Sequence, residues 1–246
     1  MTKATITAHS GCEGTIDGSM ESILRGIELG ADLVEVDVRR GAGGGLVLAH
    51  DAVEDDAGLV PLEAALREIA KHPDVGINCD LKEYGLAPEV IALAGDSGLK
   101  EGRLAFSGSL TPREVMGETS VGHRAKVYLN IEEALCALYR EKHPDAAPGA
   151  DPWEVVLRHM SERLDALIDP LINLCLKADI HALNLPPKSF IKPYLKKLGE
   201  AGVRISAWTI NEPDAMRELF RMPWLENLTT RRVALALRER DALKNG

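Results

Sequence analysis

The stretch LVEVDVRRGAGGGLVLAHD, residues 33–51, decides the fold class. Valine alternates with acidic residues at its start, so the side chains of Glu35 and Asp37 leave the same face of one strand. Taken alone, this alternation is typical of a strand with one solvated face. The glycine-rich turn that follows leads to a second short apolar run, which ends in His50 and Asp51. Whether the first strand is half-exposed or belongs to a buried sheet therefore depends on the segments that flank it.

Short apolar runs of this kind recur along the chain and alternate with longer amphipathic stretches. The predicted strands are Thr5–Ala8, Leu33–Arg39, Leu46–Ala49, Gly76–Leu81, Leu104–Ser107, Lys126–Leu129, Ala182–Leu185, Arg204–Thr209 and Asn227–Thr229. The predicted helices are Ser19–Leu29, Leu62–Lys71, Pro88–Ser97, Phe190–Ala201 and Pro213–Phe220. Alternation of strands with helices is the pattern of βα units, whose strands form a parallel sheet.

Eight such units close a barrel, and 246 residues is about the size of one (β/α)8 domain. We therefore predict the α/β class and a (β/α)8 TIM barrel that forms a single domain over residues 1–246. The extra run Leu46–Ala49 is expected to lengthen the loop after the second strand. Residues 131–179 are mostly helical, with a turn-rich interruption at His143–Pro152, and we interpret them as an enlarged helical insertion after strand 5 that can form a lid. The tail from Arg231 is predicted to be a charged closing helix.

Charge and composition argue against several classes of function. The formal net charge is −9, from 38 acidic and 29 basic residues, and nucleic-acid binding needs a concentrated basic face. No apolar run approaches the roughly 18 residues of a membrane span, and the N-terminus lacks the apolar core of a signal peptide. We therefore expect a cytoplasmic protein without an integral membrane segment. The four cysteines form no CxxC pair, which argues against zinc or redox chemistry.

Acidic residues on two predicted barrel strands indicate a cation site. Asp80, in the run INCDLKE, lies on the strand expected to follow the one that carries Glu35 and Asp37. Parallel barrel strands are buried on both faces and ordinarily apolar, so inward carboxylates need a partner. A divalent cation is the simplest partner for three carboxylates, and all-oxygen ligation favours Mg²⁺ or Ca²⁺ over zinc.

Two histidines and a lysine lie near these acids at the ends of predicted strands. His9 and His50 each follow an apolar run, and Lys82 lies two residues after Asp80. A histidine alone at such a place is more often a hydrogen-bonded structural residue. Beside a cation site, however, an imidazole suits proton transfer because it titrates near neutral pH. Lys82 would add a positive charge for a phosphoryl oxygen, so the set predicts metal-assisted phosphoryl or acyl chemistry.

Several motifs follow one another in an order that a known family shares. The stretch AHSG is followed by SMESILRGIELGADLVEVDVRRGAGGGLVLAHD, and then come NCDLKE and VRISAWTINEPDAMRELF. These stretches resemble the glycerophosphodiester phosphodiesterase family, with its His-Arg-Gly triplet, helix, GAD-x-x-E-x-D-V strand, His-Asp pair and Trp-Thr-x-Asn strand. The resemblance covers residues 4–83 and about 203–230.

The resemblance implies a TIM-barrel enzyme that hydrolyses a small-molecule glycerophosphodiester to glycerol 3-phosphate and an alcohol. By it, His9 and His50 would be the acid–base pair, and Lys82 would help to hold the phosphate. The metal ligands would be Glu35, Asp37 and Asp80. Trp208 would line the site beside the alcohol part of the substrate, and a barrel-core aromatic is an equal interpretation. Water and the substrate's own glycerol hydroxyl both remain candidates for the attacking group, the latter through a cyclic phosphate.

Two positions depart from the family pattern. Ser10, a candidate substrate-binding residue, stands where the family has an arginine at the phosphate. Lys82, Arg39 or Arg40 could compensate, and we interpret Arg39 as the better candidate because it shares a strand face with Asp37. Asp80 stands where many members have glutamate. An Asp-x-Lys at this place also resembles sphingomyelinase D-like phospholipases, which keeps a lysophospholipase D activity open. A barrel that binds phosphodiesters without turnover is the rival from another class.

Overall fold

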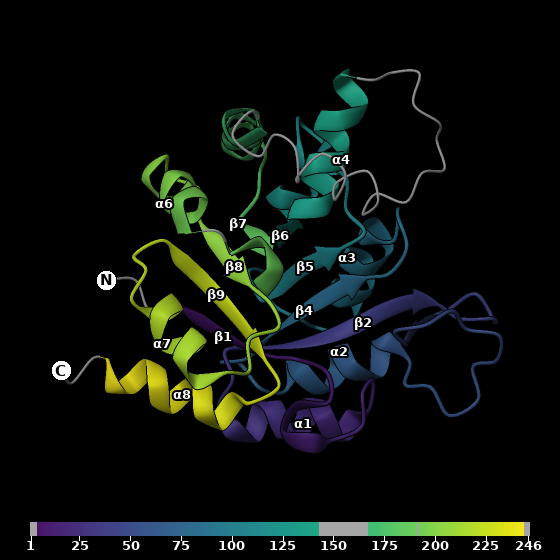
Figure 1. Ribbon diagram of the computed structural model, residues 1–246. Coiled ribbons are helices and arrows are strands. Elements are labelled where there is room, and N and C mark those ends of the chain that lie inside the picture. The colour runs from purple at the N-terminus through teal and green to yellow at the C-terminus, as the bar shows by residue number, and fades with distance from the viewer. Residues whose placement is uncertain (1–3, 143–166, 191, 244–246) are drawn as a thin grey trace.

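Strands surrounded by helices make up the part of the chain that the computed structural model describes, residues 4–142, 167–190 and 192–243 (Figure 1). The strands are β1 (Thr5–Ala8), β2 (Leu33–Arg40), β3 (Leu46–Leu48), β4 (Gly76–Leu81), β5 (Leu104–Gly108), β6 (Lys126–Asn130), β7 (Ala182–Leu185), β8 (Ile205–Ala207) and β9 (Leu225–Thr230). The α-helices are α1 (Met20–Leu29), α2 (Leu62–Ala70), α3 (Ala87–Asp96), α4 (Ile131–Lys142), α6 (Lys192–Glu200), α7 (Pro213–Phe220) and α8 (Val233–Ala242). The 3-10 turns are η1 (Cys12–Gly14), η2 (Pro112–Val115), η3 (Val121–His123) and η4 (Pro187–Ser189).

The strands form one sheet that closes on itself. Within the described residues the strand order is β1-β9-β8-β7-β6-β5-β4-β2-β3, and a further pairing of β1 with β2 closes the barrel. β3 runs antiparallel to β2, and the other strands pair in parallel. Each predicted strand and helix lies within two residues of its observed counterpart at either end. The predicted α/β class and (β/α)8 barrel are confirmed.

Helix α1 packs closely against the strands that carry the first site residues. Its amphipathic sequence buries one face against the barrel, as its periodicity predicts. A Cβ atom at Gly26 would lie 2.8 Å from Ala8 Cβ and 2.9 Å from Val34 Cγ1, so the absence of a side chain allows this approach. The contact holds α1 against β1 and β2, the strands from which His9 and Glu35 project.

The register between β2 and β4 brings two acidic residues side by side. Asp37 and Asp80 are Cα partners in this parallel ladder, and Glu35 is paired with Asn78 two residues earlier. Paired residues in neighbouring strands project from the same face of a sheet, and residues two apart share that face. The ladder therefore sends all these side chains into the barrel.

The glycine-rich turn at residues 41–45 folds β3 back along β2. Gly44 has a φ of 87°, a conformation that favours glycine. Asp56 accepts hydrogen bonds from two backbone N–H groups of this turn, at 2.7 and 2.8 Å. The chain then returns to the C-terminal end of β2, where the N–H of Ala49 donates to the carbonyl of Asp37 at 3.1 Å. This confirms that the extra strand-like run extends the loop after the second barrel strand.

The helical insertion and the C-terminal tail differ in how far the structure follows them. Helix α4 and residues 167–177 are helical, whereas the turn at His143–Pro152, and with it the expected lid, lies outside the described residues. The closing helix is present as α8, which begins at Val233, two residues after the predicted start. Arg231 and Arg232 instead continue from the C-terminal end of β9. In the described chain, no helix is both long and apolar enough to cross a membrane.

Candidate active site

A pocket with a volume of about 230 Å³ lies at the C-terminal ends of the barrel strands. Almost all of its lining residues lie on a strand or soon after one. They are His9, Asp17, Glu35, Asp37, His50, Asn78, Asp80, Lys82, Ser107, Asn184, Trp208, Thr229 and Arg231. Active sites of this architecture are built at this end of the barrel, so the pocket is the candidate active site.

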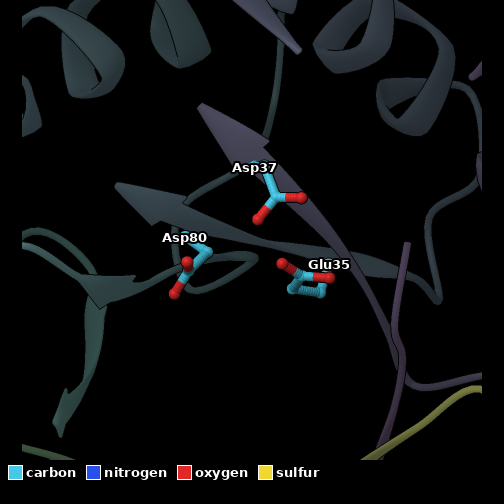
Figure 2. A group of neighbouring side chains, drawn as sticks. All are labelled: Glu35, Asp37 and Asp80. Atoms are coloured by element: carbon cyan, nitrogen blue, oxygen red, sulfur yellow. The ribbon is translucent and has the colours of Figure 1, made fainter. Parts of the chain in front are cut away.

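Three carboxylates gather at the pocket (Figure 2). Oxygen atoms of Glu35, Asp37 and Asp80 lie within 4.8 Å of one another, on the neighbouring strands β2 and β4. Glu35 and Asp37 are buried, with 6% and 5% of their surface exposed. Burial, together with the charges of Asp37 and Asp80, raises the pKa of Glu35 well above its usual range. Such a concentration of negative charge suits a bound cation, and oxygen donors at this spacing can share one ion.

Lys82 lies against two of these carboxylates. Its Nζ is 2.7 Å from Asp37 Oδ1 and 2.6 Å from Asp80 Oδ2. Burial lowers the pKa of Lys82, but Asp80 and Asp37 outweigh that effect and hold it above its usual range. The ammonium group is therefore charged at neutral pH. Ser107 donates from its hydroxyl to Asp80 Oδ1 at 2.6 Å, so the carboxylate of Asp80 is held from both sides.

The two ring nitrogens of His9 have different surroundings: Nδ1 contacts the backbone, whereas Nε2 is available for proton transfer. Its Nδ1 lies 2.8 Å from the carbonyl oxygen of Ser10, and a carbonyl can only accept, so the geometry assigns the proton to Nδ1. The ring is also 3.8 Å from Glu35 Oε2. Burial lowers the pKa of His9, and the nearby charge of Arg231 adds to that effect. The Nε2 atom is left to exchange a proton with a ligand.

His50 reaches the pocket from the turn after β3. Its Nδ1 lies 2.9 Å from Asp51 Oδ1, and this contact lowers the pKa of Asp51. The side chain of His50 is 70% exposed, in contrast to the largely buried His9. Both imidazoles therefore engage Nδ1 with a neighbouring oxygen and leave Nε2 for a ligand, which is the arrangement that proton transfer needs.

Ser10 and Arg39, which the sequence suggested as phosphate-binding residues, contact other parts of the protein in the structure. Ser10 is 2% exposed, donates its N–H to Glu35 Oε2 at 2.9 Å and accepts the N–H of Gly18 at its hydroxyl. Arg39 donates from Nε to the carbonyl of His50 at 2.9 Å and is absent from the pocket lining. Ser10 thus orients Glu35 and Arg39 supports the backbone of His50, and neither presents a side chain to the pocket.

Trp208 lines the pocket as expected, and Arg231 lines it unexpectedly. Trp208 follows β8, where its backbone N–H donates to the carbonyl of Leu185 at 3.0 Å. Arg231 follows β9, and its Nη2 lies 3.0 Å from Asp17 Oδ1. The sequence motifs did not single out Arg231, because two arginines ahead of a charged run resemble the start of a closing helix. The pairing of β9 with β1 is the signal that places it beside His9.

Comparison with known proteins shows likeness in fold rather than in sequence. No protein-family model matches the chain, and no curated protein matches its sequence. The structure of a glycerophosphodiester phosphodiesterase from Thermotoga maritima is similar with a TM-score of 0.66 at 18% identity, covering 97% of this chain and 99% of that chain. One from Parabacteroides distasonis gives 0.66 at 17% identity, covering 99% of this chain and 98% of that chain.

A third structure contains a ligand. An Oleispira antarctica phosphodiesterase, solved in complex with the product sn-glycerol-3-phosphate, is similar with a TM-score of 0.64 at 18% identity over 96% of both chains. At these identities the likeness shows the fold alone. The chain shares the barrel fold of solved glycerophosphodiester phosphodiesterases over nearly its whole length.

Proposed function

We propose that the protein is a metal-dependent phosphodiesterase that hydrolyses a glycerophosphodiester to glycerol 3-phosphate and an alcohol. The observation that carries this proposal is the meeting of two kinds of group in one pocket. Two histidines, His9 and His50, have Nδ1 engaged and Nε2 left over, and they share the pocket with three clustered carboxylates. The sn-glycerol-3-phosphate in the Oleispira antarctica structure supports the choice of product.

The carboxylates fit a divalent cation. Glu35, Asp37 and Asp80 would hold it, because their oxygens lie within 4.8 Å of one another and their combined charge exceeds what Lys82 neutralises. Hard oxygen ligands favour Mg²⁺ or Ca²⁺. When bound, such a cation would neutralise charge on a phosphoryl oxygen.

The histidines would move the two protons that hydrolysis requires. One Nε2 accepts a proton from the attacking hydroxyl, and the other Nε2 donates a proton to the oxygen of the leaving alcohol. The carbonyl of Ser10 engages Nδ1 of the largely buried His9, and Asp51 engages Nδ1 of the exposed His50. Each contact leaves Nε2 as the ring nitrogen that can exchange a proton with the substrate.

Lys82 and Trp208 would bind the two parts of the substrate. Lys82 keeps its positive charge in the pocket and stabilises negative charge that develops on the phosphoryl group. Trp208 offers an apolar indole face to the alcohol part. The acidic surface of the chain poses no obstacle to a small anionic substrate, because a bound divalent cation would reverse the local charge of the pocket.

The proposal is tested by turnover of glycerophosphocholine and glycerophosphoethanolamine, with release of glycerol 3-phosphate as the readout. We expect activity with Mg²⁺ or Ca²⁺, loss of activity with a chelator, and recovery when the cation is returned. A protein that binds glycerol 3-phosphate but turns over neither diester would contradict the proposal and indicate a binding barrel. Choline release from lysophosphatidylcholine, without activity on either glycerophosphodiester, would indicate the lysophospholipase D alternative.

A further inference from the structure

The pocket contains a second strong cation that no sequence motif singled out. Lys82 is already held by Asp37 and Asp80, at 2.7 and 2.6 Å. Among the described residues that line the pocket, Arg231 supplies a guanidinium, and its side chain is 44% exposed. A phosphodiester brings a further negative charge to a site that already holds three carboxylates. The exposed guanidinium of Arg231 is therefore placed where it could contact the negative charge of a bound phosphodiester.

The barrel fixes the backbone of Arg231 on both sides. The N–H of His9 donates to the carbonyl of Thr230 at 2.9 Å, which ties the end of β1 to the end of β9. The N–H of Arg231 donates to Asn211 Oδ1 at 2.9 Å, and its carbonyl accepts the N–H of Glu13 at 2.8 Å. These hydrogen bonds hold the backbone of Arg231 in place next to His9.

The present contacts of the guanidinium leave it able to bind an anion. Nη2 pairs with Asp17, whose side chain is 53% exposed, and exposed pairs of this kind are weak. Nε lies 3.3 Å from His9 Nδ1. That nitrogen cannot both donate to the Ser10 carbonyl and accept from Arg231, and the carbonyl contact is the shorter, at 2.8 Å. The N–H at Nε is therefore poorly satisfied and suited to an oxygen of a ligand.

The other nearby positions cannot take this role. Ser10 is buried and its hydroxyl already accepts the N–H of Gly18. Arg39 is turned toward the His50 carbonyl, with its Nη1 3.6 Å from Glu83 Oε1. A planar guanidinium, in contrast to an ammonium, can contact two phosphate oxygens at once.

We propose that Arg231 binds the non-bridging oxygens of the substrate phosphate from the side of the pocket next to His9. The proposal rests on the phosphodiesterase function proposed above, and it names the residue that takes the place of an arginine at position 10. Arg231 then acts by direct contact with the substrate. Substrate phosphate would also compete with Asp17 for the guanidinium.

The test compares Arg231→Gln and Arg231→Lys with Arg232→Gln, a matched change of the next arginine, which does not line the pocket. Calorimetric titration with sn-glycerol 3-phosphate, in the presence of Mg²⁺, measures the affinity of each variant for the phosphate group. A charge-assisted hydrogen bond is lost in Arg231→Gln, and for an exposed group we expect the low end of the usual range, about tenfold weaker binding. We expect Arg231→Lys to be intermediate and Arg232→Gln to match the wild type.

Two further measurements separate phosphate contact from a structural role. The melting temperature and the Mg²⁺ affinity of Arg231→Gln should equal those of the wild type, and added methylguanidinium should partly restore product binding by Arg231→Ala. Unchanged product affinity and KM in an active enzyme would overturn the role of Arg231 and leave the phosphodiesterase function standing. Arg231-dependent product binding without turnover would do the reverse. Wild-type protein that binds no sn-glycerol 3-phosphate would overturn the role of Arg231.

Discussion

Asp37 and Asp80 are direct partners across the β2–β4 ladder, and the ammonium group of Lys82 contacts a carboxylate oxygen of each. The lysine thus offsets part of the repulsion between two acids that the register forces together. Glu35 is left out of this arrangement, and burial together with the charges of Asp37 and Asp80 raises its pKa well above the usual range. Lys82 therefore contacts two of the three carboxylates, and its single positive charge balances only one of them.

The first prediction concerns Glu35→Gln. The variant should bind Mg²⁺ or Ca²⁺ at least about tenfold more weakly, since it loses one charged ligand. Without metal, its melting temperature should equal or exceed that of the wild type, because a neutral amide avoids the cost of a buried charge. Calorimetry with the cation and thermal melting in a chelator measure the two quantities, and Glu54→Gln is an exposed control. Unchanged cation affinity in Glu35→Gln would remove Glu35 from the metal site.

The second prediction concerns Lys82→Met. Removal of the ammonium leaves Asp37 and Asp80 without a counter-charge, and breaking a buried pair of this kind costs about 3 kcal/mol in the free energy of unfolding. Because a bound cation would replace the missing charge, saturating Mg²⁺ or Ca²⁺ should recover most of this loss. Urea unfolding with and without the cation is the measurement. A loss that no divalent cation recovers would show that Lys82 acts by packing instead.

The third prediction concerns the two histidines. His9→Ala and His50→Ala should each lower kcat by ~10²–10⁴, the usual effect of losing a general acid or base. The exposed His50 should be replaceable without a change in melting temperature, and His72→Ala on the outside of the barrel serves as the control for both. A near-normal kcat in either variant would show that the corresponding imidazole transfers no proton.

The fourth prediction concerns a buried acid beside the barrel mouth. Burial raises the pKa of Glu132 to about 7, and its Oε1 accepts a hydrogen bond from Asn130. A raised folded-state pKa means that the folded protein holds a proton that the unfolded chain releases. Stability from Glu132 is therefore fully present below its usual pKa of 4.5 and is lost as the pH rises through about 7.

The size of this effect follows from the shift. A difference of two to three pKa units corresponds to about 3 kcal/mol. Urea unfolding measures the free energy of unfolding of the wild type at pH 4.5 and at pH 8. Between these two values the wild type should lose about this much more stability than Glu132→Gln, which lacks the titrating group. An identical pH dependence in the two proteins would place the titration on another group.

The barrel was predictable from the sequence because its signals are local. Each short β-branched run needs only its own residues to be recognised, and the helices between them carry their own apolar periodicity. Glu35 and Asp37 could be assigned to one face for the same reason. That Asp80 lies on the next strand of the same barrel was inferred only because the barrel had already been inferred, and the register that pairs it with Asp37 comes from the structure.

What the sequence could not predict depends on contacts between distant segments. Arg39 has the right spacing from Asp37 to face the pocket, but the returning strand β3 offers it the carbonyl of His50. Ser10 is drawn into the protein by the N–H of Gly18. Arg231 reaches the site only because β9 closes the barrel against β1, more than two hundred residues away along the chain.

The two histidines are held by different parts of the fold, because His50 follows the hairpin of β2 and β3 and His9 follows a strand of the closed barrel. His9 is anchored in the closed barrel wall, whereas His50 stands at the end of an added arm whose glycine-rich turn is held by Asp56. The antiparallel ladder of β3 with β2 and the N–H of Ala49 on the carbonyl of Asp37 set the position of His50. One histidine therefore depends on the closure of the barrel, and the other depends on a hairpin outside that closure.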